Sequence, residues 1–127
     1  MKRDYLVIDA GNTNTEVGLY NEQGFITSWR LSSDITRTED EIFSHISSLS
    51  KQKQIDLEGV GVCAIASVVP ELTRIYHHLF EKYFNAEIIT IDGNTDVGLT
   101  FLTEDHSFVG ADLIINAYSA RSKYNTN

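Results

Sequence analysis

The residues best suited to chemistry follow a short apolar run near the amino terminus. Residues 9–15 read Asp-Ala-Gly-Asn-Thr-Asn-Thr, so one carboxylate and one glycine stand among small polar side chains. Gly11 allows a bound group to approach the backbone, and its neighbours offer N–H and hydroxyl donors to a phosphate. Asp9 is placed to hold a hydrated Mg²⁺ beside that phosphate. The segment is therefore interpreted as a phosphate-binding loop.

Two purely structural interpretations stay open, one for residues 9–15 and one for Asp112. The same residue types are common in ordinary hairpin turns for conformational reasons, although this polar segment is longer than a tight hairpin requires. Asp112 lies at the start of a predicted helix, where a carboxylate can simply complement the helix dipole. The functional reading makes Asp112 a general base that takes a proton from a substrate hydroxyl.

The histidines and the cysteine offer no further site. His77 and His78 are adjacent on a predicted helix and face different ways, so they cannot share a metal. His45 and His106 have no partner at ligand spacing, which argues against a zinc site. Cys63 is the only cysteine, and it lies in an apolar run, as a small core residue does.

Apolar patterning predicts the elements that must position these residues. Short apolar stretches predict strands at residues 5–8, 16–20, 25–31, 60–66 and 87–91. Thr38 and Glu41 form a capping-box pattern before a first helix, and Pro70 suits the first turn of a second. The expected buried faces are Ile42, Phe43, Ile46 and Leu49 on the first helix, and Leu72, Ile75, Tyr76, Leu79, Phe80 and Tyr83 on the second. A last helix is expected from about Gly110, with Leu113, Ile114, Ala117 and Tyr118 as its apolar residues.

The order of these elements predicts an α/β fold. The first three strands form an antiparallel meander, and the alternation of strands and helices afterwards implies parallel pairing with right-handed crossovers. The result is a ribonuclease H-like, five-stranded mixed sheet (meander, then β-α-β-α-β) with helices on its faces. Ligands bind at the carboxyl ends of such strands, so the Asp9 loop, the turn at Ser67 and Asp112 are expected to converge there. Residues 1–127 are expected to form a single domain.

Composition narrows the class of protein. Apolar residues make up 42% and charged residues 22%, as in an ordinary globular protein. The apolar stretches are too short for a membrane span, and the start resembles neither a signal nor a transit peptide, which predicts a cytoplasmic protein without a membrane partner. A net charge of −8 without a basic stripe argues against nucleic-acid binding. An acidic protein must hold phosphate with backbone N–H groups, hydroxyls and a metal.

Four blocks of sequence, in order, carry a family resemblance that runs nearly end to end. They are residues 9–20, residues 29–41 with Trp29-Arg30 and Arg37-Thr38-x-Asp40-Glu41, residues 65–70 (Ile-Ala-Ser-Val-Val-Pro), and residues 109–112 (Val-Gly-Ala-Asp). Together they resemble the N-terminal domain of the type III pantothenate kinases, members of the sugar-kinase/heat-shock/actin superfamily. The resemblance implies an ATP-dependent enzyme that phosphorylates the hydroxyl of pantothenate, the first step of coenzyme A synthesis.

The resemblance also implies cofactors and roles for particular residues. It implies Mg²⁺ and a monovalent cation, K⁺ or NH₄⁺, with Asp9 helping to hold the Mg²⁺. Contacts to ATP fall to Gly11, Asn12, Thr13 and Asn14. The catalytic base is Asp112, and the substrate-binding residues are Gly110, Ala111 and Asp112.

This sequence departs from the family pattern next to Asp112. The family continues with Arg, whereas this chain has Leu113, and Thr103 and His106 align with a family Tyr and Pro. Loss of a guanidinium that binds a carboxylate removes a contact worth roughly 1.5–3 kcal/mol. The family also has a second domain, so we expect either a homodimer or a missing C-terminal domain. Two hypotheses follow: a pantothenate kinase or its N-terminal half, and a non-catalytic binding or regulatory relative that acts through a partner chain.

Overall fold

The computed structural model describes residues 4–91 of the chain. In chain order the elements are β1 (Asp4–Ala10), β2 (Asn14–Asn21), β3 (Gly24–Ser32), α1 (Glu39–Gln52), the short 3-10 helix η1 (Leu57–Gly59), β4 (Val60–Ser67), α2 (Pro70–Tyr83) and β5 (Glu87–Ile91). All five predicted strands and the first two predicted helices are present. The helix expected from Gly110 lies outside the described residues.

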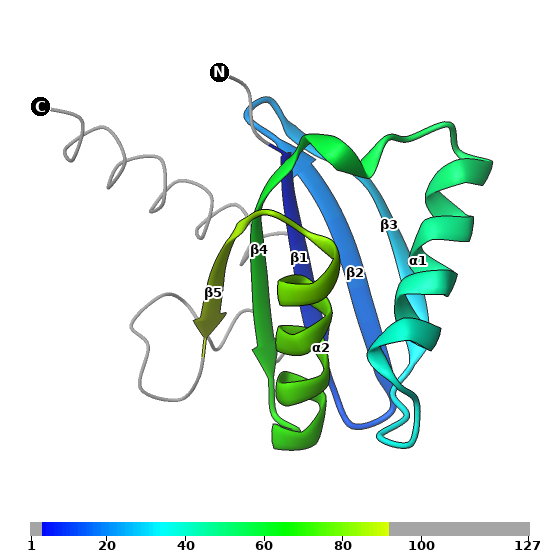
Figure 1. The fold of residues 1–127 in the computed structure, drawn as a ribbon, viewed down its shortest axis with the longest axis vertical. Coiled ribbons are helices and arrows are strands. Elements are labelled where there is room, and N and C mark those ends of the chain that lie inside the picture. Colours follow the sequence, from blue (N-terminus) through cyan, green and yellow to red (C-terminus); the bar gives the residue numbers. More distant parts are fainter. Residues whose placement is uncertain (1–3, 92–127) are drawn as a thin grey trace, which may run out of the picture.

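The strands form one mixed sheet in the order β3-β2-β1-β4-β5 (Figure 1). β2 pairs antiparallel with both β1 and β3, which is the predicted meander. β1 pairs in parallel with β4, and β4 with β5, which places a helical crossover before each of the last two strands. This arrangement confirms the predicted ribonuclease H-like topology.

Side chains of β1 alternate between two apolar clusters, one on each face of the sheet. Leu6 and Ile8 belong to the larger cluster, whereas Tyr5 and Val7 belong to the smaller one. All four are at most 4% exposed, so the strand is buried on both faces, as the run of apolar residues predicts.

Both described helices cover the same face of the sheet (Figure 1). They contribute Ile42, Ile46, Leu72, Tyr76, Leu79 and Phe80 to the larger cluster. Within residues 4–91, helices therefore cover one face of the sheet, whereas the sequence predicted helices on both faces. None of the described helices is long and apolar enough to cross a membrane.

Helix α1 begins and ends with local backbone motifs. At its start the Thr38 hydroxyl accepts a hydrogen bond from the Glu41 N–H at 3.2 Å, and the Glu41 carboxylate accepts one from the Thr38 N–H at 2.9 Å. This is the predicted capping box. At its end Gln54 takes a left-handed conformation with φ 58°. The N–H groups of Gln54 and Ile55 donate to the carbonyls of Lys51 and Ser50 at 3.0 and 2.9 Å, which is a Schellman motif.

The carboxyl end of α2 meets the start of α1 through aromatic and charged contacts. The rings of Phe43 and Tyr83 stack at 3.9 Å between centroids. Lys82 Nζ lies 2.8 Å from a carboxylate oxygen of Asp40, and the Tyr83 hydroxyl donates to the same carboxylate. Tyr83 is 38% exposed, so its assignment to the buried face of α2 is wrong. It lies in the last turn of α2, where the ring covers Phe43 at the rim of the core.

Candidate phosphate-binding site

The loop after β1 and the turn after β4 lie side by side. Ala10 and Ser67 are register partners at the carboxyl ends of the two parallel strands. The N–H of Val68 donates to the Ala10 carbonyl at 3.3 Å, which ties the turn to the start of the loop. The predicted convergence of these two segments is confirmed. The third expected member, Asp112, lies outside the described residues, as do Gly110 and Ala111.

The loop itself is closed by its glycine. The N–H of Gly11 donates to the Asn14 carbonyl at 3.0 Å, so this donor is used within the loop. A Cβ at Gly11 would lie 3.3 Å from the same carbonyl oxygen, tighter than most real contacts. Asn12 and Thr13 are exposed, and no acceptor among residues 4–91 is bonded to their N–H groups. These two N–H groups are therefore the loop donors best placed for a ligand.

Ser33 holds the loop from outside and was missed by the sequence analysis. Its hydroxyl donates to the Gly11 carbonyl at 2.7 Å, and its N–H donates to the Thr13 carbonyl at 2.8 Å. Its hydroxyl also lies 2.8 Å from that of Thr15, a fully buried residue in β2. The only sequence signal is a pair of serines directly after a predicted strand, which by itself predicts a loop.

Asp9 lies in a row of charged residues across the sheet. It is the register partner of Glu16 on β2, and Glu16 is in turn the partner of Arg30 on β3. Cross-strand partners share a face of the sheet, so the carboxylates of Asp9 and Glu16 project from the same face. Arg30 forms a 4.0 Å ion pair with Glu16. The row thus carries two carboxylates and one compensating cation.

This row fits a hydrated Mg²⁺ better than a metal caged by protein ligands. Within the described part of the chain, no group of three or more His, Cys, Asp or Glu could hold a metal ion. Mg²⁺ is commonly bound by one or two carboxylates, with waters and substrate phosphates completing its octahedron. Asp9, beside Glu16 and next to the loop, supplies that kind of donor set.

The Ser67 hydroxyl makes its hydrogen bonds within the local turn. Its hydroxyl accepts from the Val69 N–H at 2.9 Å and donates to the Val69 carbonyl at 3.0 Å. Helix α2 follows with Pro70 in its first turn and no side-chain cap on Val69. Because the first N–H groups of a helix lack partners inside it, the start of α2 adds partial positive charge at the edge that carries the loop.

Arg37 brings a cation to the same edge. Asp34, one residue after Ser33, accepts from the N–H and hydroxyl of Thr36 at 2.9 and 2.6 Å, and Arg37 Nε lies 3.7 Å from its other oxygen. The side-chain hydrogen bond from Thr36, with smaller help from Arg37, lowers the pKa of Asp34. The carboxylate therefore stays charged and pairs with Arg37 on the segment that follows Ser33.

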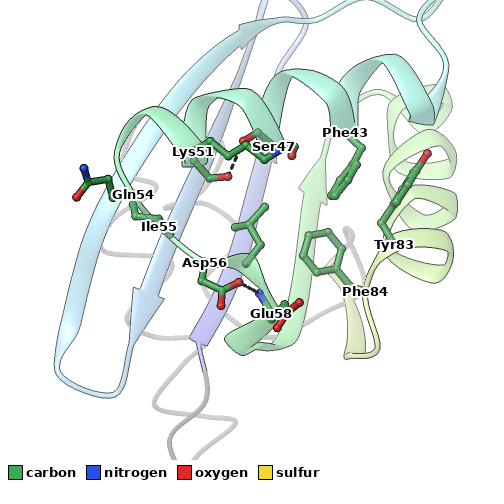
Figure 2. A pocket seen from close by; sticks show the side chains of 11 residues that line it. Phe43, Ser47, Lys51, Gln54, Ile55, Asp56, Glu58, Tyr83 and Phe84 are labelled. Carbon is green, nitrogen blue, oxygen red and sulfur yellow. Dashed lines mark hydrogen bonds between the residues drawn. The ribbon is translucent and has the colours of Figure 1, made fainter.

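A separate hollow of about 510 Å³ lies away from the loop (Figure 2). Its walls come from α1, from the connection that precedes β4, and from Tyr83 and Phe84 before β5. In Figure 2, Phe43, Tyr83 and Phe84 gather on one side and Asp56 and Glu58 on another. Since β4 and β5 run from this end toward the carboxyl edge, the hollow is not part of the loop site.

The fold and the loop define the chain as an α/β domain with a glycine-containing loop suited to phosphate at the carboxyl end of its first strand. The sequence profile of the type III pantothenate kinases matches residues 5–127. This chain belongs to the type III pantothenate kinase family.

Individual relatives agree with this assignment. The chain is 37% identical over 119 residues to the type III pantothenate kinase of Desulfatibacillum aliphaticivorans, covering 94% of this chain and 46% of that protein. It is 35% identical over 119 residues to that of Exiguobacterium sibiricum, covering 94% and 47%. The chain thus spans about half the length of these curated relatives. Among solved structures it is similar to YeaZ from Pseudomonas aeruginosa, with a TM-score of 0.47 at 11% identity over 71% of this chain and 43% of that one. This last similarity adds nothing to the family assignment.

Proposed function

We propose that the protein carrying this chain transfers the γ-phosphoryl group of ATP to the hydroxyl of pantothenate. The observation that carries the proposal is the family match over residues 5–127. The loop after β1 supports it, because it presents exposed N–H groups beside an acidic residue. Phosphoryl transfer needs mainly positioning, metal and one base, and the chain has residues suited to each.

The ATP phosphates are proposed to lie against the loop formed by Gly11, Asn12, Thr13 and Asn14. Asn12 and Thr13 donate backbone N–H groups, while Gly11 contributes by leaving room for close approach. Asp9 would hold Mg²⁺, which would neutralise charge on the phosphates. A monovalent cation, K⁺ or NH₄⁺, completes the proposed cofactors.

Asp112 is proposed as the catalytic base, with Gly110 and Ala111 beside it in contact with the substrate. Asp112 accepts the proton of the pantothenate hydroxyl as that oxygen bonds to the γ-phosphorus. The bond between the γ-phosphorus and the bridging oxygen breaks, and ADP leaves with the electron pair.

We further propose that residues 1–127 form a single domain, equivalent to the N-terminal half of a two-domain kinase. The protein acts in the cytoplasm, as a homodimer, on a small-molecule substrate and without a nucleic-acid or membrane partner. The length relation to the curated relatives, of which the chain spans about half, supports the two-domain reading.

A second candidate function is a non-catalytic relative that binds or regulates through a partner chain. The observation that favours it is Leu113, which stands where the family pattern has an arginine. A leucine cannot form the charge-assisted contact that an arginine makes with a carboxylate such as that of pantothenate.

The test is ATP-dependent formation of phosphopantothenate by the protein that carries this chain, with Mg²⁺ and K⁺ or NH₄⁺ present. Asp112→Asn is the negative control, and Leu113→Arg tests the departure from the family. Turnover that disappears in the Asp112→Asn variant supports the kinase. Absence of turnover in both the wild type and Leu113→Arg, with intact folding, argues against it and favours the non-catalytic relative.

A further inference from the structure

Two hydroxyls lie in series behind the carbonyl of Gly11. Thr15 on β2 lies 2.8 Å from the Ser33 hydroxyl, and Ser33 donates to the Gly11 carbonyl at 2.7 Å. Thr15 is 0% exposed, so water does not compete for its hydroxyl. We call Thr15 and Ser33 the hydroxyl relay.

The direction of the relay follows from counting protons, since each hydroxyl has only one. Ser33 uses its proton on the Gly11 carbonyl, so in its contact with Thr15 it accepts and Thr15 donates.

Ser33 thereby fixes which way the loop faces. The peptide between Gly11 and Asn12 is trans, so its carbonyl and its N–H point in opposite directions. With the carbonyl held by Ser33, the Asn12 N–H must point away from Ser33. The backbone N–H of Ser33 captures the Thr13 carbonyl at 2.8 Å in addition, so one residue orients two peptides of the loop.

We propose that Ser33, supported by Thr15, is a positioning residue that orients the loop, and with it the Asn12 N–H, toward the nucleotide phosphates. The identity of the ligand in this inference rests on the proposed function, whereas the arrangement of Ser33 and the loop does not. A preorganised donor is worth more to an anion than one that must be ordered on binding. A single residue far from the loop in sequence then tunes phosphate affinity without touching the phosphate.

The experiment compares Ser33→Ala, which removes the hydroxyl, with Ser33→Thr, which keeps it. Ser32→Ala is the matched control, because Ser32 is the exposed neighbour on β3. Each variant is measured by calorimetric titration with MgATP and with AMP, by amide hydrogen exchange at residues 11–14, and by thermal unfolding.

Ser33→Ala is expected to weaken MgATP binding about fivefold, the value of one net hydrogen bond. It should also speed hydrogen exchange at the loop amides. The affinity for AMP, which lacks the β- and γ-phosphates, should fall less. Ser33→Thr and Ser32→Ala should stay near the wild type.

Different results would contradict the proposed function and the positioning role of Ser33. If the wild type does not bind MgATP, that result contradicts the proposed function. The exchange data still test whether Ser33 orients the loop. Exchange at Asn12 that is the same in Ser33→Ala as in Ser32→Ala overturns the positioning role. So does unchanged MgATP affinity in a Ser33→Ala variant that remains folded.

Discussion

Asp9 on β1 lies directly opposite Glu16 on β2, at the point where β1 gives way to the loop. Two carboxylates that share a face of a sheet repel each other, and like charges directly opposite are destabilising. A bound cation relieves this repulsion. The pairing would therefore give the proposed Mg²⁺ site a favourable electrostatic contribution beyond its direct ligand, in addition to the charge that Arg30 supplies to Glu16.

This relationship predicts graded effects on Mg²⁺ dependence. Asp9→Asn should raise the Mg²⁺ concentration for half-maximal activity by about tenfold or more, as the proposed ligand is lost. Glu16→Gln should raise it less, because only a neighbouring charge is removed. Mg²⁺ titration of initial rates measures both, with the exposed Glu22→Gln as control. A larger effect at Glu16 than at Asp9 would reverse the assignment.

The proposed role of Asp112 as the base predicts that its substitution changes catalysis but not nucleotide binding. Asp112→Asn should lower kcat by about 10²–10⁴-fold, the range expected for general acid–base catalysis. It should leave the Kd for MgATP unchanged, since the loop after β1 is the proposed site of the phosphates. Rapid-quench kinetics and calorimetric titration test this. A loss of MgATP affinity equal to the loss in kcat would instead show damage to the nucleotide site.

The left-handed Gln54 predicts a stabilising substitution. A non-glycine residue at φ 58° carries a steric cost that glycine lacks. Gln54→Gly should therefore increase the free energy of unfolding by up to about 1 kcal/mol in urea denaturation. Gln52→Gly, inside α1, should lower it by about the same amount. Equal destabilisation by the two variants would mean that Gln54 has no strain to relieve.

The buried thiol predicts protection from chemical modification. Cys63 lies in the middle of β4 with 0% exposure, and burial raises its pKa to about 12. Because the thiolate is the reactive form, a thiol reagent such as Ellman's reagent should react with the folded protein far more slowly than with the protein in denaturant. Absorbance at the two conditions gives both rates. Rapid reaction of the native protein would show that β4 opens readily.

The contact between α1 and α2 predicts an acid-sensitive contribution to stability. The hydrogen bond from Lys82, followed by that from Tyr83, lowers the pKa of Asp40 from 3.8. A lowered carboxyl pKa stabilises the folded state above the unfolded pKa, and this stabilisation is lost as pH falls through the lower folded pKa. The difference in unfolding free energy between wild type and Asp40→Asn should be constant near neutral pH and shrink below pH 3.8.

Denaturant melts across acidic pH measure this difference. Since Asp40 is exposed, added salt should reduce the difference as well. Glu22→Gln, at an exposed turn, should show no such trend. A wild-type advantage that persists at the lowest pH would assign the effect to packing and not to ionisation.

Local patterns predicted those parts of the fold that depend on neighbouring residues. The capping box of Thr38 and Glu41 was predictable because both partners lie within one turn of helix. The meander was predictable because its strands are consecutive and joined by short polar turns. The buried strand around Leu6 and Ile8 followed from an unbroken apolar run.

Other features depended on contacts that no local pattern records. Tyr83 has the right spacing for the buried face of α2, yet it lies at the rim because α2 ends where α1 begins. Ser33 is separated from Gly11 by 22 positions, so its role appears only once the loop after β3 is folded against the loop after β1. The bond from the Gly11 N–H to the Asn14 carbonyl, by contrast, joins residues three positions apart, and the sequence analysis did not identify it.

The sequence by itself determined the family, the order of strands and helices, and the residue types of a phosphate-binding loop. Periodicity and motif spacing encode these directly, because they reflect burial and backbone conformation over a few residues. Only the tertiary structure decided which loop donors face outward, which residue orients them, and that Asp9 stands opposite a second carboxylate. Those facts arise from register and packing between distant segments, and the free energy that selects them is shared among contacts far apart in the chain.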